Sequence, residues 1–116
     1  MAMTIVHTVQ GPRITVAVKG DLDLKTADPL RDALDRLIER YRDKHLILDL
    51  TEVDFVDSSG LGVILGRYRR LAGQGRTMAL TGAKPAVRSV LDMAGIGSIM
   101  SVSDSVGRSP VRDGRL

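Results

Sequence analysis

Residues 53–66 read VDFVDSSGLGVILG and pass from an apolar strand, through a polar turn, into the first turns of a helix. A helix that begins at such a turn leaves its first backbone N–H groups without partners and carries the positive end of its dipole there. Both features suit a serine oxygen that caps the helix, and both also suit a phosphate group. This stretch predicts a strand followed by a helix, with a candidate functional serine at their junction.

The segments on either side of this turn alternate between strand and helix. Residues 13–19 alternate apolar and polar side chains, as in a strand with one buried face, and the apolar residues of 30–41 recur at helical spacing. The patterns predict the order strand, strand, helix, strand, helix, strand, helix, strand. The expected ranges are 4–9, 13–19, a helix beginning within 26–29, 45–50, 58–72, 77–81, 85–94 and 99–102.

That order predicts an α/β domain with a mixed, mostly parallel sheet of four or five strands and helices packed on it. The nearly continuous apolar run at 45–50 is typical of a central strand covered on both faces. Thr26 and Asp28 compete as the N-cap of the first helix, and Ser58 or Ser59 is expected to cap the second.

The chain has 116 residues, which is enough for one domain with its own core. Its three aromatic side chains are Tyr41, Phe55 and Tyr68, so the core must be aliphatic. We expect one domain over residues 1–102. Residues 103–116 contain Gly, Pro and Arg with few apolar side chains, and we expect them to form a mobile tail.

The composition excludes several classes of protein. The absence of cysteine excludes disulfides, thiol chemistry and thiolate metal sites. No apolar run approaches the ~20 residues needed to span a membrane, and the N-terminus does not resemble a secretory signal. His7 and His45 lack ligand-like spacing, so we expect no metal and no cofactor. The expected location is the cytoplasm, with no membrane partner.

The net charge of +3 conceals an asymmetry. Residues 20–57 hold 11 of the 14 acids against 6 bases, whereas residues 58–91 hold 6 bases and no acid. This separation is consistent with a polar recognition surface, and also with two differently solvated faces. The arginines are spread along a helix and a strand, so the sequence gives no compelling indication of direct nucleic-acid binding.

Several interpretations of the turn at 57–62 compete. The serines can simply cap the helix. A dinucleotide loop requires G-x-G-x-x-G, but the third glycine here is Gly66, one position too late, and a P-loop requires Gly-Lys-Ser/Thr. A serine hydrolase requires glycine where Asp57 stands and a histidine as base. The remaining interpretation is a serine that regulates binding.

Three glycines lie within the helix expected at 58–72: Gly60, Gly62 and Gly66. Each costs ~1 kcal/mol relative to alanine inside a helix, so some other interaction should compensate. Close packing of the helix on the sheet is one explanation. A smooth helix surface that another protein approaches is the other, and the residues alone leave both open.

The run DSSGLGVILGRY at 57–68 closely resembles the phosphorylation segment of the sporulation-type anti-sigma factor antagonists, which are small bacterial STAS domains. GDLD at 20–23 is similar to the family's G-E-L-D loop, and 85–87 and 91–95 resemble its third-helix region. The similarity covers about residues 4–102. It implies the STAS fold and no enzymatic activity.

The resemblance also implies a switch. In this family the unphosphorylated protein binds an anti-sigma factor that is also an ATP-dependent serine kinase, and a sigma factor is released. The kinase phosphorylates the first serine of D-S-S-G, here Ser58, and a PP2C-type phosphatase restores the binding form. The implied partner-binding residues are Asp21, Asp23, Asp57, Ser58, Ser59, Gly60 and Gly62.

One departure bears on the choice of partner. Members of the family commonly end in another helix, whereas the region after Val102 is rich in glycine and arginine. The alternative function is a STAS module that does not switch, either within a larger signalling assembly or as a nucleotide sensor.

Overall fold

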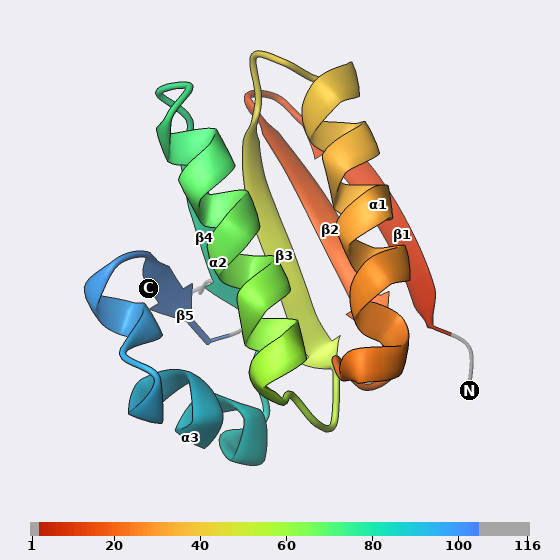
Figure 1. Cartoon of the computed structure of the whole chain (residues 1–116). Helices are drawn as coiled ribbons and strands as arrows, with labels where there is room; N and C mark the ends of the chain where they lie inside the picture. Colours follow the sequence, from red (N-terminus) through yellow and green to blue (C-terminus); the bar gives the residue numbers. More distant parts are fainter. Residues whose placement is uncertain (1–2, 105–116) are drawn as a thin grey trace, which may run out of the picture.

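The computed structural model describes residues 3–104 and contains a five-stranded sheet with strand order β1-β2-β3-β4-β5 (Figure 1). β1 pairs antiparallel with β2, and the other neighbouring pairs are parallel, so the predicted mixed, mostly parallel sheet is confirmed. The elements are β1 (Thr4–Gln10), β2 (Arg13–Lys19), α1 (Leu24–Arg40), β3 (His45–Glu52), α2 (Ser58–Ala72), β4 (Met78–Thr81), α3 (Pro85–Met93), a 3-10 turn (Ile96–Ser98) and β5 (Ser101–Ser103).

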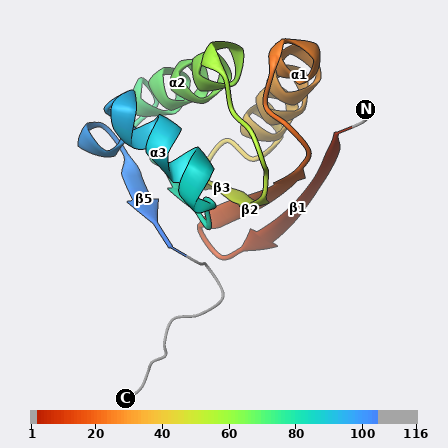
Figure 2. The ribbon, with the colours of Figure 1, turned by 90° about the horizontal axis from the view of Figure 1, so that it is seen from below.

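The three helices lie on one face of the sheet (Figure 2). Alternate strand residues point into this layer, and those of β2 and β3 are almost completely buried there. The buried hydrophobic residues of the described chain include no aromatic side chain, which confirms the prediction of an aliphatic core. The buried strand residues of β2 and β3 are Ile14, Val16, Val18, Leu46, Leu48 and Leu50.

The prediction that β3 is covered on both faces is wrong. Leu46, Leu48 and Leu50 are buried beneath the helices, whereas Ile47 and Asp49 lie on the opposite face and are only half-buried. Within residues 3–104 no helix covers that face (Figure 2). Neighbouring strands on both sides shield Ile47 instead, so an apolar residue is tolerated there without a second helical layer.

The start of α1 also differs from the prediction. The helix begins at Leu24, and its N-cap is Asp23 rather than Thr26 or Asp28. The Asp23 carboxylate accepts hydrogen bonds from the backbone of Lys25 (3.0 Å) and Thr26 (3.2 Å). Thr26 returns the contact, because its hydroxyl oxygen accepts from the Asp23 N–H (3.0 Å). Thr26 is therefore the third residue of a capping box rather than the cap.

Acids of the segment 20–57 form ion pairs with arginines of the segment 58–91. Asp35 of α1 pairs with Arg67 (3.1 Å) and Arg70 (3.0 Å) of α2, and Glu39 also pairs with Arg70 (2.8 Å). Part of the charge asymmetry is thus used inside the molecule, where it joins the two helices side by side (Figure 1). The domain boundary at residue 102 stays a prediction, and nearly all of the expected tail, from residue 105, lies outside the described residues.

Candidate functional site

The candidate site lies where the loops that follow β2 and β3 meet the start of α2 (Figure 1). The two loops are joined by a short parallel bridge between Leu22 and Val56. The N–H of Leu22 donates to the carbonyl oxygen of Phe55 (2.8 Å), and the N–H of Asp57 donates to that of Leu22 (3.0 Å). Leu22 and Val56 are both buried. This bridge brings the GDLD loop beside the serine turn.

Asp57 caps α2, which corrects the prediction that Ser58 or Ser59 does so. One oxygen of the Asp57 carboxylate accepts from the N–H groups of Ser59 (2.8 Å) and Gly60 (3.1 Å). A carboxylate fills this position well, because it satisfies two free donors and carries the negative charge that the helix dipole favours. The sequence favoured the serines over the aspartate that precedes them.

Because Asp57 caps the helix, the Ser58 side chain takes no part in the cap. It is the first residue of α2 and is exposed, and its hydroxyl has no hydrogen-bond partner within residues 3–104. Ser59 follows it and is half-buried. A hydroxyl held at a fixed point of the backbone, open to solvent and unpartnered, is accessible to a modifying enzyme.

The glycines of α2 differ in what surrounds them. A Cβ added to Gly60 would lie 2.6 Å from the backbone oxygen of Leu22 and 2.7 Å from its Cβ, so Gly60 is required for the helix to approach the GDLD loop. A Cβ on Gly62 or Gly66 would meet nothing within 4 Å. Close packing therefore explains Gly60, and it explains neither Gly62 nor Gly66.

The two aspartates of the GDLD loop have different surroundings. Asp21 is exposed, and its carbonyl oxygen accepts from the hydroxyl of Thr26 (2.6 Å). Asp23 is half-buried, and its carboxylate is engaged as the cap of α1. The Asp23 side chain thus holds the loop against the start of α1, whereas the Asp21 side chain is available at the surface.

Two exposed apolar side chains border the GDLD loop and the serine turn, and neither of them is among the predicted site residues. Leu24 is 77% exposed and Phe55 is 51% exposed. Leu24 falls outside the apolar stripe of α1, and Phe55 lies in the acidic segment DFVD. Their positions in the sequence could therefore have indicated that these two apolar side chains are exposed. Leu24 also borders a shallow groove of about 350 Å³ between α1 and α2, lined by Leu24, Ala27, Asp28, Arg31, Ser59, Gly62, Val63 and Arg67.

The two histidines lie away from the serine. His45 is the first residue of β3 and Ser58 follows the end of that strand, which spans about 23 Å. The His45 Nδ1 atom accepts from the N–H of Thr77 (2.9 Å), and the His7 ring packs near Tyr41, with centroids 6.0 Å apart. Neither imidazole can serve Ser58 as a general base, which contradicts the hydrolase interpretation.

Residues 3–104 offer neither a metal site nor a membrane-spanning helix. Those residues contain no group of three or more His, Asp or Glu side chains arranged to hold a metal ion. The helices there are all too short or too polar to cross a membrane.

Comparison with known proteins agrees with this geometry. The model of the STAS domain family matches residues 4–109. An anti-sigma F factor antagonist of Paenibacillus polymyxa is 41% identical over 92 residues, which cover 79% of each chain. The structure of the anti-sigma factor antagonist SpoIIAA in its unphosphorylated form is 25% identical, with a TM-score of 0.76 over 91% of this chain and 90% of that one. For the phosphorylated form of the Bacillus protein SpoIIAA the identity is 24% and the TM-score 0.69, over 91% and 93%.

Proposed function

Since the chain belongs to the STAS domain family, we propose that it is an anti-sigma factor antagonist switched by phosphorylation of Ser58. Its unphosphorylated form binds an anti-sigma factor that is also a serine kinase, and the sigma factor is released in the cytoplasm. A PP2C-type phosphatase removes the phosphate and restores binding. The observation that carries the proposal is the exposed Ser58 hydroxyl, which the helix cap does not use because Asp57 fills it.

We define the docking surface as the three residues of the serine turn, the two aspartates of the GDLD loop beside it and two glycines at the start of α2. Gly62 lets a partner approach the backbone of α2, and the exposed Leu24 and Phe55 add apolar area at its border. The residues of the docking surface are Asp21, Asp23, Asp57, Ser58, Ser59, Gly60 and Gly62. Asp23 and Gly60 contribute by holding the loop and the helix in place.

A phosphate on Ser58 would change the charge of the docking surface more than its shape. Phosphorylation adds about −1.5 to −2 charges beside Asp57, with the exposed Asp21 on the adjoining loop. Asp57 already accepts two N–H groups of the helix start, so the phosphate would meet fewer free donors there and remain available to repel a partner. A loss of about 3 kcal/mol in binding free energy weakens affinity about a hundredfold, which suffices for a switch.

The proposal is tested with the cognate anti-sigma kinase and ATP. We expect one phosphate on the wild-type protein and none on Ser58→Ala, detected by intact-protein mass spectrometry. The matched control is Ser59→Ala, which removes the neighbouring hydroxyl and should still be phosphorylated. If Ser58→Ala accepts phosphate as the wild type does, the site assignment is wrong.

The second test measures partner binding. Ser58→Asp places a negative charge at the switch position and should weaken binding to the anti-sigma factor, whereas Ser58→Ala should bind as the unmodified protein does. Equal affinity of the two variants in calorimetry would contradict the switch and favour the alternative, a STAS module that does not change partners.

A further inference from the structure

β1 is one of the two edge strands of the sheet, and it pairs only with β2 within residues 3–104, so its other side is open to hydrogen bonding. The direction of the backbone groups alternates along a strand. The carbonyl oxygen of Pro12 accepts from the N–H of His45 (2.9 Å), so in β2 residues 14, 16 and 18 also face β3. Their neighbours in β1 are Val9, His7 and Ile5, which therefore direct their N–H and C=O groups outward.

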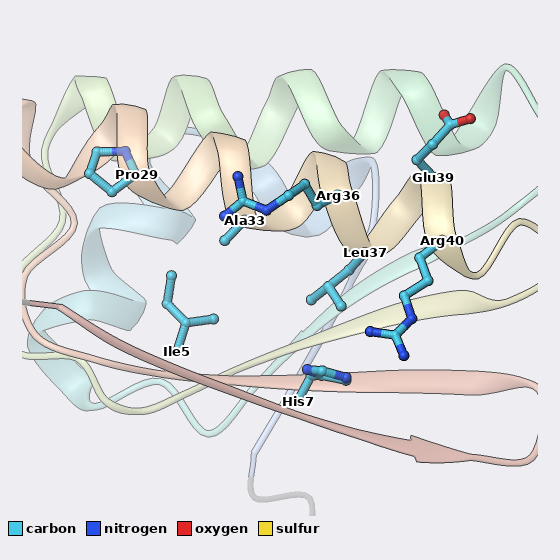
Figure 3. A pocket seen from close by; sticks show the side chains of 8 residues that line it. All are labelled: Ile5, His7, Pro29, Ala33, Arg36, Leu37, Glu39 and Arg40. Atoms are coloured by element: carbon cyan, nitrogen blue, oxygen red, sulfur yellow. The ribbon is translucent and has the colours of Figure 1, made fainter.

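The same three residues carry their side chains on the α1 side of the sheet, because their partners in β2 are buried there. Two of them, Ile5 and His7, line a groove of about 790 Å³ between β1 and α1 (Figure 3). Ala33 and Leu37 of α1 complete its apolar part. We call this the β1–α1 groove, lined by Ile5, His7, Pro29, Ala33, Arg36, Leu37, Glu39 and Arg40. It shares no residue with the docking surface.

Two arginines make the β1–α1 groove cationic. Arg40 extends from α1 toward β1, whereas Arg36 lies along α1 beside Ala33 (Figure 3), and neither forms an ion pair with an acid of residues 3–104. The Arg40 guanidinium lies 5.1 Å from the centroid of the Tyr41 ring. Glu39 also lines the groove, but its carboxylate points away from Ile5 and His7 (Figure 3) and is engaged by Arg70 (2.8 Å) and by Arg42. The two guanidinium groups are thus available to an anionic ligand.

We propose that the β1–α1 groove binds an extended acidic peptide segment of a partner protein, which adds a strand to the free edge of β1. Alternate residues of a strand lie about 6.7 Å apart, and residues four apart on a helix advance about 6 Å. Acids at positions i and i+2 of the peptide would therefore match the spacing at which Arg36 and Arg40 leave α1, and these long side chains can turn to reach them. Apolar residues on either side of them would cover Ile5 and Ala33, and the edge would supply main-chain hydrogen bonds.

A second copy of the chain fits this groove less well. Its own free strand, β1, reads TIVHTVQ and contains no carboxylate, so pairing of two β1 edges would leave Arg36 and Arg40 of both copies without counter-charges. The strand also lacks the lysine and proline that commonly protect an open edge from pairing. An acidic partner strand uses both the open edge and the arginines.

The test uses a fluorescent peptide with blocked ends, Val-Thr-Glu-Thr-Glu-Thr-Val, whose sequence reads the same in both directions and so requires no assumption about strand direction. Fluorescence anisotropy at low ionic strength should show saturable binding to the full chain. The peptide with lysine in place of both glutamates should not bind. The variant carrying Arg36→Glu and Arg40→Glu should bind the acidic peptide at least about tenfold more weakly.

Two controls separate this binding from general charge attraction. Arg69→Glu changes an exposed arginine of α2 outside the groove and should leave peptide affinity unchanged. Two further peptides carry N-methyl groups on alternate backbone nitrogens, one on the odd-numbered and one on the even-numbered residues. In a bound strand only one of these two sets of N–H groups faces β1, so one of the two methylated peptides should bind weakly. The proposal is overturned if the acidic peptide does not bind, if the double variant binds it normally, or if both methylated peptides bind as well as the parent. Self-association of the chain through β1 in place of peptide binding also overturns it.

Discussion

Asp57 and Ser58 are adjacent in the chain, but their side chains have different environments. The carboxylate of Asp57 faces the helix and accepts two backbone donors, whereas the hydroxyl of Ser58 faces solvent. The structural role and the proposed regulatory role are therefore carried by separate residues. A switch residue that does not support the helix can be modified without unfolding the site.

This separation predicts unequal costs of substitution. Asp57→Ala should lower the free energy of unfolding by about 1–2 kcal/mol, because two donors at the start of α2 lose their acceptor. Ser58→Ala should change it by less than about 0.5 kcal/mol, as at other exposed positions. Urea unfolding followed by circular dichroism measures both. Similar losses in the two variants would show that Ser58 helps to cap the helix after all.

At the scale of single elements, α2 shows why a helical glycine cannot be interpreted from its spacing. Gly60 and Gly62 are two residues apart and have the same intrinsic cost in a helix. The first faces Leu22 across the bridge between the loops, and the second faces open space. The distinction depends on a residue 38 positions earlier in the chain, so no local pattern could have predicted it.

We therefore expect opposite effects from two alanine substitutions in α2. Gly60→Ala should destabilise the protein by about 1–3 kcal/mol, because its Cβ would overlap the backbone of Leu22. Gly62→Ala should stabilise the protein by about 0.5–1 kcal/mol. Alanine has less conformational freedom than glycine in the unfolded chain, and its Cβ meets nothing in the folded helix. Thermal and urea unfolding of both variants provide the measurement. If Gly62→Ala destabilises the fold, the helix surface there is not open.

The Gly62→Ala variant also tests the role of Gly62 in partner binding. If Gly62 belongs to the docking surface, Gly62→Ala should weaken binding to the anti-sigma factor even though it stabilises the fold. Binding and stability would then move in opposite directions, which a purely structural defect cannot produce. Gly66→Ala is the matched control, because its Cβ also meets nothing within 4 Å and Gly66 lies outside the docking surface.

At the scale of the whole molecule, one buried arginine ties distant segments together. Arg76 is only 8% exposed and precedes β4. Its guanidinium donates to the carbonyl oxygens of Tyr41 (2.6 Å) and Ile38 (3.2 Å) at the end of α1 and of Lys44 (2.8 Å) before β3. Burial lowers the pKa of this guanidinium from its ordinary value, and the nearby Arg70 lowers it further.

Loss of this guanidinium should affect the whole fold. Arg76→Met keeps much of the side-chain volume but leaves three carbonyl groups without their donor, and we expect a loss of about 3 kcal/mol in the free energy of unfolding. Arg69→Met, at an exposed position of α2, is the control and should be nearly neutral. Chemical denaturation of the two variants tests the difference, and equal stability would contradict the role assigned to Arg76.

Local sequence patterns predict the order of elements, the buried face of β2 and the position of the serines at the start of a helix. These properties follow from hydrophobic period and turn residues, which act over a few positions. The sequence also placed Asp21, Asp23 and Ser58 on neighbouring loops, through the resemblance of two motifs rather than through any local pattern. The caps were misassigned because several oxygen-bearing side chains stood within reach of each helix start.

The sequence could not show which glycine must remain a glycine, or which strand edge and arginines are left open. Both depend on contacts between segments far apart in the chain, Leu22 against Gly60 and α1 over β1, and so does the contact of Arg76 with the end of α1. Such contacts are fixed by the packing of the whole sheet and its helices. A pattern that extends over one element carries no record of what lies across from it.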